Sequence, residues 1–350
     1  LQSRGGILGK GVAAGTAQML AGPGHGALIG SGDLHELGDE ASGHGAAEQL
    51  RGEVAGSRGG HHRLACADDA EVVDALFGAV EKWAVGQGME ALQGPMGFTD
   101  MDHEGMLIEG FDQIGTMATI YNYPYYPKQM ERMGYTKDQD WHEFKIYIPD
   151  GVPEKHLRIG EIVKKKYGLK VMKFKNAKSI MPYAQKVFRT LNESYAPLYG
   201  FARLTQKQID YYINMYIPML RYDLVTLIVR EEDDEVVGFG ISLPNLSKAM
   251  QKAKGHLFPF GWIYLLKALK SKPKVIDLYL TGVLPEYQSK GVNALLFNDL
   301  IPVYKSVGAI YAESNPELET NNAVQAQWDY FKREHHKTRR AYIKQLKGKS

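Results

Sequence analysis

Hydrophobic and polar positions follow two periods along most of the chain, one typical of helices and one typical of strands. Over residues 72–84 apolar side chains recur at three- and four-residue spacing after the acidic start at Asp69, which predicts an amphipathic helix. Over residues 275–283 they alternate singly, which predicts a strand. The same criteria predict helices over 126–133, 177–191, 205–216, 292–307 and 320–333, a strand pair within 141–148, and strands over 89–92, 169–174, 224–230, 236–244, 309–314 and 339–344. The order is that of a mixed α/β (α+β) fold.

The clearest internal boundary is the Pro-Asp-Gly-Val-Pro run at residues 149–153, because two prolines around Asp-Gly end both helix and strand. We therefore expect a first domain over residues 67–150, a linker over 151–168 and a second domain over 169–346. Residues 246–270 form a broken helical insert in the second domain. For this insert three interpretations stay open: a lid over the acceptor side, a surface packed on the first domain, and an interfacial membrane helix.

Residues 1–66 differ in composition from the rest of the chain. They contain 17 of the 38 glycines and 5 of the 11 histidines but none of the 37 aromatic residues. Such a stretch buries too little apolar area to offset its ordering entropy, so we expect it to be disordered or poorly packed. Because the change is abrupt and the chain starts at Leu1, we interpret the stretch as an out-of-frame translation or an assembly artefact. A natural Gly/Ala-rich tail is the alternative.

Charge and cysteine content narrow the classes of function. With 42 Lys plus Arg against 40 Asp plus Glu, the net charge of +2 provides no field for a nucleic acid, and no membrane partner is expected. The single cysteine, Cys66, cannot form an internal disulfide, and no apolar run or leader segment stands out, so we expect a soluble cytoplasmic protein. Asp100, Asp102, His103 and Glu104 share one loop, where we expect turn caps; no metal is predicted.

The segment that indicates a binding site is residues 283–296, Val-Leu-Pro-Glu-Tyr-Gln-Ser-Lys-Gly-Val-Asn-Ala-Leu-Leu. A strand ends at a proline, a short turn contains a glycine, and a helix follows at once, so several unpaired N–H groups face one point. These amides, the helix dipole and Lys290 are suited to a pyrophosphate. The motif is neither a Walker loop nor a dinucleotide fingerprint. The alternative is an ordinary turn in which Gly291 serves only close packing.

The run Val-x-Pro-x-x-Gln-x-x-Gly-Val, followed by a helix, a strand and Asn321-Asn322, resembles motifs A and B of the GNAT acetyltransferase superfamily. The resemblance implies a GNAT fold in the second domain, with acetyl-CoA held by its pyrophosphate on the loop and by its pantetheine arm between splayed strands. It also implies that a backbone amide of a bulged strand near Leu284 polarises the thioester carbonyl. Asn293 replaces the family's second Gly or Ala. The cofactor residues it assigns are Val283, Leu284, Gln288, Ser289, Lys290, Gly291, Val292 and Asn293.

Acetyl transfer needs a neutral amine, a polarised thioester and close positioning of the two. Glu313 is the candidate general base, with Asp277 and Tyr279 as other candidates; a solvated strand-end carboxylate is the alternative for Glu313. Trp328 stands where many family members have the Tyr that protonates the thiolate, so Tyr330 is the candidate acid, with a core aromatic as its alternative. The predicted function is transfer of an acetyl group from acetyl-CoA to an unidentified amine. The other hypothesis is a non-catalytic CoA-binding or scaffold protein.

The first domain also shows a resemblance. Residues 94–107 and 121–127 resemble a bacterial group of tandem GNAT-like proteins, which implies that residues 67–150 are a degenerate half of a GNAT domain. Asp68, Asp69 and Glu71 occupy the place of the glycine loop and repel phosphate, so one cofactor site is expected. The early strands of this half would have to lie within residues 1–66, and we expect none there.

Overall fold

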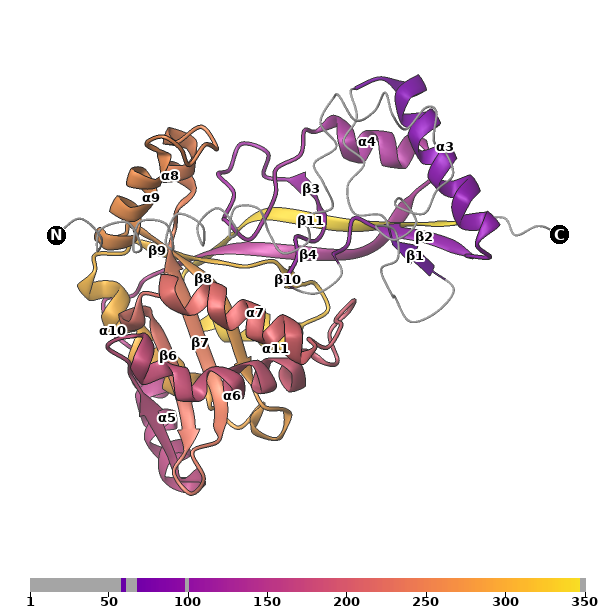
Figure 1. Ribbon diagram of the computed structural model, residues 1–350. Coiled ribbons are helices and arrows are strands. Elements are labelled where there is room, and N and C mark those ends of the chain that lie inside the picture. Colours follow the sequence, from indigo (N-terminus) through magenta and orange to yellow (C-terminus); the bar gives the residue numbers. More distant parts are fainter. Residues whose placement is uncertain (1–57, 61–67, 98–100, 347–350) are drawn as a thin grey trace. The chain divides into compact units, whose positions relative to one another are not determined.

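The computed structural model describes residues 58–60, 68–97 and 101–346 (Figure 1). The chain divides into two compact units. Among the described residues, unit 1 holds 114–118 and 142–336, and unit 2 holds the remainder. The division falls inside two long strands, β4 (Thr136–Tyr147) and β11 (Arg333–Gln345). The domain boundaries expected from the sequence stay predictions.

Unit 1 is built on a mixed sheet. Neighbouring strands are antiparallel except β8 and β9, which are parallel. Since helices separate several of these strands in the chain, the predicted mixed α/β class is confirmed. In spatial order the strands are β5 (Leu169–Met172), β6 (Val225–Arg230), β7 (Val236–Pro244), β8 (Val275–Val283), β9 (Tyr311–Ser314) and the second half of β4, with β10 (Glu317–Leu318) also on β4.

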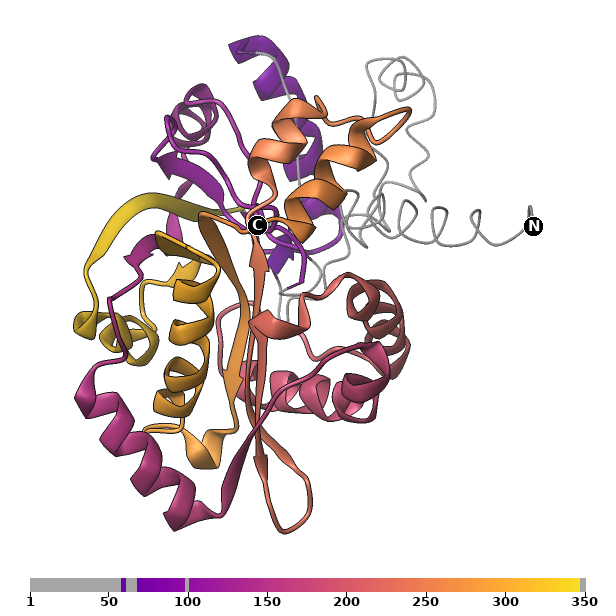
Figure 2. The ribbon, with the colours of Figure 1, turned by 90° about the vertical axis from the view of Figure 1, so that its left-hand side faces the viewer.

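Helices cover both faces of this sheet (Figure 2). On one face α6 (Ala177–Tyr195) packs on β7 and β8, and α7 (Gln206–Tyr216) packs on α6. Both helices begin with a capping box, from Asn176 and Thr205. On the other face lie α5 (Glu154–Tyr167) and α10 (Asn293–Ser306). The remaining short helices of unit 1 are η1 (Ile217–Met219), η2 (Tyr222–Leu224), α8 (Ser247–Lys252), α9 (Gly261–Lys270), η3 (Pro285–Tyr287), α11 (Asn322–Gln327) and η4 (Trp328–Tyr330).

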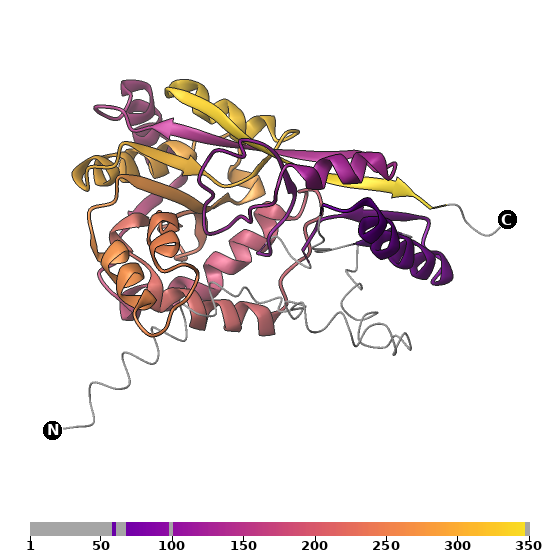
Figure 3. The same ribbon diagram turned by 90° about the horizontal axis from the view of Figure 1, so that it is seen from above.

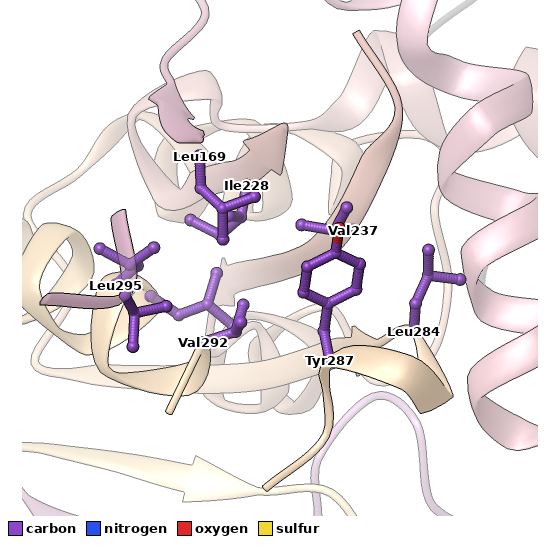
Figure 4. Packing of buried hydrophobic residues seen from close by; sticks show 9 residues of the cluster. Leu169, Ile228, Val237, Leu284, Tyr287, Val292 and Leu295 are labelled. Atoms are coloured by element: carbon purple, nitrogen blue, oxygen red, sulfur yellow. The ribbon is translucent and has the colours of Figure 1, made fainter. Parts of the chain in front are cut away.

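The core beneath α5 and α10 joins the sheet to the turn that precedes α10. Leu169 and Ile228 come from the strands, and Val292 and Leu295 from the start of α10 (Figure 4). Tyr287, from η3, packs into the same cluster. Burial of this apolar set fixes where the turn between β8 and α10 lies on the sheet.

Unit 2 has its own core. Val73 and Phe77 pack with Leu92, Met130 and Tyr342. Strand β1 pairs in parallel with β2, and β2 and β3 are antiparallel to the end of β11. Besides the first half of β4, the elements are β1 (Arg58–Gly60), α3 (Ala70–Gly86), β2 (Ala91–Gly94), β3 (Met106–Glu109) and α4 (Tyr125–Arg132).

Most predicted elements are present, and several differ. The expected linker over 151–168 contains α5, and the expected strand pair within 141–148 is part of the single strand β4. The helix predicted over 320–333 ends as α11 at Gln327, and the closing strand begins at Arg333 rather than at residue 339. Residues 58–60 form a strand where none was expected, while residues 1–57 and 61–67 lie outside the described part. Among the described residues, no helix combines the length and apolar content needed to cross a bilayer.

Candidate active site

Strands β8 and β9 separate halfway along β8. They pair from Val275 with Tyr311 to Leu278 with Ser314, and β9 ends there. Strand β8 continues to Val283 alongside β7. Over residues 279–283 the far edge of β8 therefore has no strand beside it in the described residues. This open edge is the splay that the GNAT resemblance implies for a pantetheine arm.

A bulge marks the point where the strands separate. The register of β7 with β8 shifts between Ile241 and Ser242 and leaves Tyr279 without a partner on β7. Such a bulge changes which residues of a strand face each neighbour. The resemblance implies a bulge near Leu284, whereas the register shift lies at Tyr279, and the N–H of Leu284 donates to the carbonyl of Val237 at 2.9 Å.

Side chains already bond the carbonyls along the open edge of β8. Because the N–H and C=O of one strand residue point to the same edge, the N–H groups of Thr281 and Val283 face the open side as well. These two amides are thus placed to donate to an extended ligand chain. Three side chains donate hydrogen bonds to these carbonyls. Asn315 Nδ2 donates to the carbonyl of Tyr279, Tyr195 Oη to that of Thr281 at 2.9 Å, and Gln288 Nε2 to that of Val283 at 3.0 Å.

The turn that follows β8 leaves backbone amides open at the start of α10. Ser289 and Gly291 have φ values of 58° and 82°, so the chain turns through the left-handed region twice. The described hydrogen bonds include no acceptor for the N–H groups of Ser289, Gly291, Val292 and Asn293, and no side chain caps α10. Open amides at the positive end of a 14-residue helix are suited to an anion. This is the arrangement that the sequence predicts for the turn.

Neighbouring side chains define the surroundings of this turn. A Cβ on Gly291 would lie 2.7 Å from Ile159 Cγ2 of α5, so the glycine is also required by packing. The ammonium of Lys290 lies 5.3 Å from the ring centre of Tyr167, and Lys290 is exposed at the rim. The Nδ2 of Asn293 lies 3.5 Å from Gln327 Oε1 of α11. Gly291 is therefore required for packing on α5, and the open amides are present as well.

An apolar cavity lies between α6, α7 and the sheet, beside the bulge. The space between its walls is about 640 Å³ when the gaps between the lining atoms and the open solvent at its mouth are both counted. Except for three tyrosines, every lining side chain is a hydrocarbon or a thioether. The hydroxyls of Tyr216 and Tyr279 lie 3.1 Å apart in its wall. The lining residues are Ile180, Ala184, Val187, Phe188, Leu191, Tyr212, Ile213, Tyr216, Ile217, Met219, Leu220, Ile241, Leu243, Tyr279 and Leu280.

Glu313, the predicted base, is buried in β9. It is 1% exposed, so the alternative of a solvated strand-end carboxylate is wrong. Its Oε1 lies 3.3 Å from Nε2 of His336, whose side chain is 3% exposed and makes no aligned hydrogen bond among the described residues. Asp277, its partner in the β8–β9 register, is also buried and accepts from Asn245 Nδ2 at 2.8 Å. Glu313 and His336 thus form a buried acid–imidazole pair one residue from the splay.

The other predicted catalytic residues have different surroundings. Burial raises the pKa of Tyr279 above its ordinary value near 10, which disfavours a role as base. Tyr330 is 49% exposed and is not a core aromatic; its hydroxyl accepts from Lys155 at 2.6 Å and its ring packs on His156. These contacts tie it to α5, and none brings it to Glu313. Trp328 is buried.

No local pattern in the sequence points to His336 or to the cavity. The sequence shows adjacent histidines at 335 and 336, but the strand predicted from it begins at residue 339. The position of these histidines within β11 was therefore not predicted. In the described residues no group of three or more His, Cys, Asp or Glu could hold a metal ion, and Asp100 lies outside them.

Comparison with known proteins places the chain near bacterial relatives. No protein-family model matches it. It is 28% identical to "Protein YghO" of Escherichia coli over 85% of this chain and 77% of that protein. It is also 28% identical to "Bacterial ceramide synthase" of Caulobacter vibrioides, over 81% of this chain and 74% of that protein.

Solved GNAT N-acetyltransferase structures are among those similar to this chain. One is a tandem GNAT protein from the clavulanic acid biosynthesis pathway, with 12% identity and a TM-score of 0.45, covering 85% of this chain and 77% of that one. The strand order, the splay of β8 from β9 and the turn into α10 are the features that the GNAT resemblance implied. The chain thus has a mixed α/β fold with the strand splay and open turn that the GNAT resemblance implies, and it is similar in sequence to a protein named "Bacterial ceramide synthase".

Proposed function

We propose that this protein is an acyl-CoA-dependent N-acyltransferase whose substrate carries a hydrocarbon chain in the cavity between α6 and α7. The observation that supports this most strongly is the open edge of β8 leading directly into the uncapped start of α10. The four open amides bind the pyrophosphate of CoA, and Lys290 adds positive charge at the rim. The N–H groups of Thr281 and Val283 bind the pantetheine arm, whose thioester then lies near Tyr279.

The reaction is direct attack of an amine on the thioester. The amine nitrogen forms a bond to the acyl carbon, the carbon–sulfur bond breaks, and the CoA thiolate leaves with that electron pair. The proton lost by the amine passes to His336, which Glu313 orients and stabilises as the imidazolium. The thiolate takes up a proton from water or from a neighbouring hydroxyl. Positioning on the rigid strand β8 supplies much of the acceleration.

The cavity favours a longer chain than the acetyl group predicted from the sequence. An acetyl group leaves the apolar wall in contact with water, whereas each buried methylene contributes about 0.8 kcal/mol. The relative from Caulobacter vibrioides is called a ceramide synthase, and a ceramide is the amide of a fatty acid with a long-chain amino alcohol. Both components of such a product carry hydrocarbon chains, and either chain fits the chemistry of the cavity wall.

Calorimetric titration of CoA, acetyl-CoA and octanoyl-CoA into the full chain tests this proposal. We expect octanoyl-CoA to bind roughly 30-fold more tightly than acetyl-CoA, about 2 kcal/mol. Ala184→Phe fills the cavity from α6 and should remove that difference while CoA itself binds as before; Ala184→Ser is the matched control. Equal affinity for the two thioesters, with Ala184→Phe binding them alike, would assign the cavity to the amine's chain. Absence of CoA binding by the folded protein would refute the proposal.

A second experiment separates an acyltransferase from a CoA-binding scaffold. Release of free CoA is followed with octanoyl-CoA and a long-chain primary amine. His336→Asn should lower kcat by at least about 100-fold and leave the Kd for octanoyl-CoA within about threefold. CoA binding without turnover for any amine would support the scaffold hypothesis.

A further inference from the structure

The hairpin of α8 and α9 is fixed at its base and extends from unit 1 between β7 and β8. The helices lie side by side in Figures 2 and 3. Leu246 and Leu265 are buried in a small cluster that includes Met117. The hydroxyl of Ser247 donates to the carbonyl of Gly115, and Arg221 donates to the carbonyl of Ser271 at 2.9 Å. These contacts hold the inner face of the hairpin and leave its tip outside the core.

The tip of the hairpin exposes large apolar side chains. Phe258 and Phe260 are 67% and 68% exposed, and Ile263 and Tyr264 are 45% and 44% exposed. Thirteen large hydrophobic side chains are exposed among the described residues, and these four fall within seven consecutive positions. Exposed apolar side chains grouped in this way indicate an interaction surface.

Close packing holds the tip in this shape. A Cβ on Gly261 would lie 1.7 Å from the carbonyl oxygen of His256, so the chain folds back directly on itself. The N–H of Trp262 donates to the carbonyl of Leu257 at 2.9 Å, and its indole donates to Pro259 at 3.0 Å. Phe258 and Phe260 are therefore presented to solvent by an ordered turn.

The charged side chains of the segment that carries this tip are all positive. Residues 245–274 contain seven lysines and no Asp or Glu. All seven are exposed, and none forms an ion pair within the part of the chain that the structure describes. On α9, Lys267 follows Ile263 by four residues and Tyr264 by three, so apolar and basic side chains share one exposed stripe. The lysines are Lys248, Lys252, Lys254, Lys267, Lys270, Lys272 and Lys274.

We propose that the α8–α9 hairpin docks this protein on the surface of an anionic lipid bilayer. The side chains of Phe258, Phe260, Ile263 and Tyr264 enter the headgroup region, and the lysines contact anionic headgroups. Amphipathic surfaces with aromatic residues and lysine bind membranes in this way, and the lysines are attracted to anionic headgroups. The absence of any carboxylate from the segment favours a bilayer over an ordinary protein partner. This inference goes beyond the proposed function and does not depend on it.

Vesicle flotation with the full chain tests the docking. Vesicles of phosphatidylcholine alone are compared with vesicles containing about 30% phosphatidylglycerol, at physiological salt. We expect binding to the anionic vesicles and at least about tenfold weaker binding to the neutral ones. The double substitution Phe258→Ser with Phe260→Ser should weaken binding to anionic vesicles at least about tenfold. Both side chains are exposed, so the thermal midpoint should not move.

Two further double substitutions test whether the hairpin tip and its lysines are responsible for vesicle binding. Tyr121→Ser with Tyr123→Ser removes two other exposed aromatic side chains and should leave vesicle binding unchanged. Lys252→Glu with Lys267→Glu should abolish the preference for anionic vesicles. The proposal is overturned if anionic vesicles are not bound, if Phe258→Ser with Phe260→Ser binds them like the parent, or if an acidic polypeptide such as polyglutamate is bound in place of vesicles. None of these outcomes depends on acyl-CoA binding, which is measured separately.

Discussion

Two helices of this molecule, α3 in unit 2 and α10 in unit 1, begin in opposite ways. At α3 the Asp69 carboxylate accepts from the N–H groups of Glu71 at 2.9 Å and Val72 at 3.3 Å, so the protein supplies its own anion. At α10 no described side chain takes that place, and four backbone N–H groups stay open within the part of the chain that the structure describes. A helix start that stabilises the fold is closed by a carboxylate, whereas one that binds a phosphate has to be left open.

Another carboxyl group, that of Glu317, is buried, and burial outweighs the nearby groups that favour its charged form. Glu317 accepts from Trp328 Nε1 at 2.8 Å through one oxygen, and burial raises its pKa from 4.5 to about 8. The folded protein therefore keeps the proton between about pH 5 and 8, where the unfolded chain has released it. Stability is unaffected by this group below about pH 4.5 and decreases as the pH rises towards 8.

The largest expected effect follows from this carboxyl group. Glu317→Gln keeps an acceptor for Trp328 and removes the ionisation, so it should raise the free energy of unfolding at pH 9 by on the order of 4 kcal/mol and change it little at pH 4.5. Urea unfolding at both pH values measures this. Glu161→Gln, on the exposed side of α5, is the control and should change neither value. An equal effect of Glu317→Gln at both pH values would contradict the raised pKa.

The next effect concerns the glycine that shapes the open helix start. Gly291→Ala places a Cβ 2.7 Å from Ile159 at a φ of 82°, and should destabilise the protein by about 2 kcal/mol. Gly151→Ala, with nothing within 4 Å of the new Cβ, should stay within about 0.5 kcal/mol. Thermal unfolding measures both variants. A Gly291→Ala protein as stable as the parent would show that the turn is not packed on α5 in this way.

The smallest expected effect is at the closed helix start. Asp69→Ala removes the cap of α3 and should cost about 1 kcal/mol, whereas Asp69→Asn keeps an acceptor and should cost a few tenths. Neither change should alter the affinity for CoA, because α3 is not part of the proposed site. A loss of CoA affinity in Asp69→Ala would mean that the two helix starts are not independent.

The sequence predicts the open turn well because the signals there are local. The proline after β8, Gly291 and the apolar period of α10 act within a dozen residues, and the unpaired amides follow from the way a helix begins. The pairing of Glu313 with His336 has no such signal. It joins β9 to β11, and burial of a histidine beside a carboxylate depends on the register of strands distant in sequence.

Two other differences have the same origin. Helix α5 was not predicted because its sequence between Pro153 and Gly168 is rich in lysine and has few apolar positions. Packing on α10 stabilises the helix. The sequence suggests Tyr330 because of its spacing from Trp328. In the structure Tyr330 contacts Lys155 and His156 of α5 instead of Glu313. These contacts of Tyr330 could not be foreseen without α5, and its role as the acid stays a prediction.

The central claim is that the start of α10 binds the pyrophosphate of CoA because no carboxylate closes it. Calorimetric titration of CoA into Ser289→Asp and Ser289→Asn tests this most directly, since Asp and Asn both tolerate the φ of 58° at this exposed position and differ only in charge. Ser289→Asp should raise the Kd for CoA by roughly 30-fold or more, about 2 kcal/mol, and Ser289→Asn should change it by less than about threefold. Equal affinities for the two variants would contradict the claim.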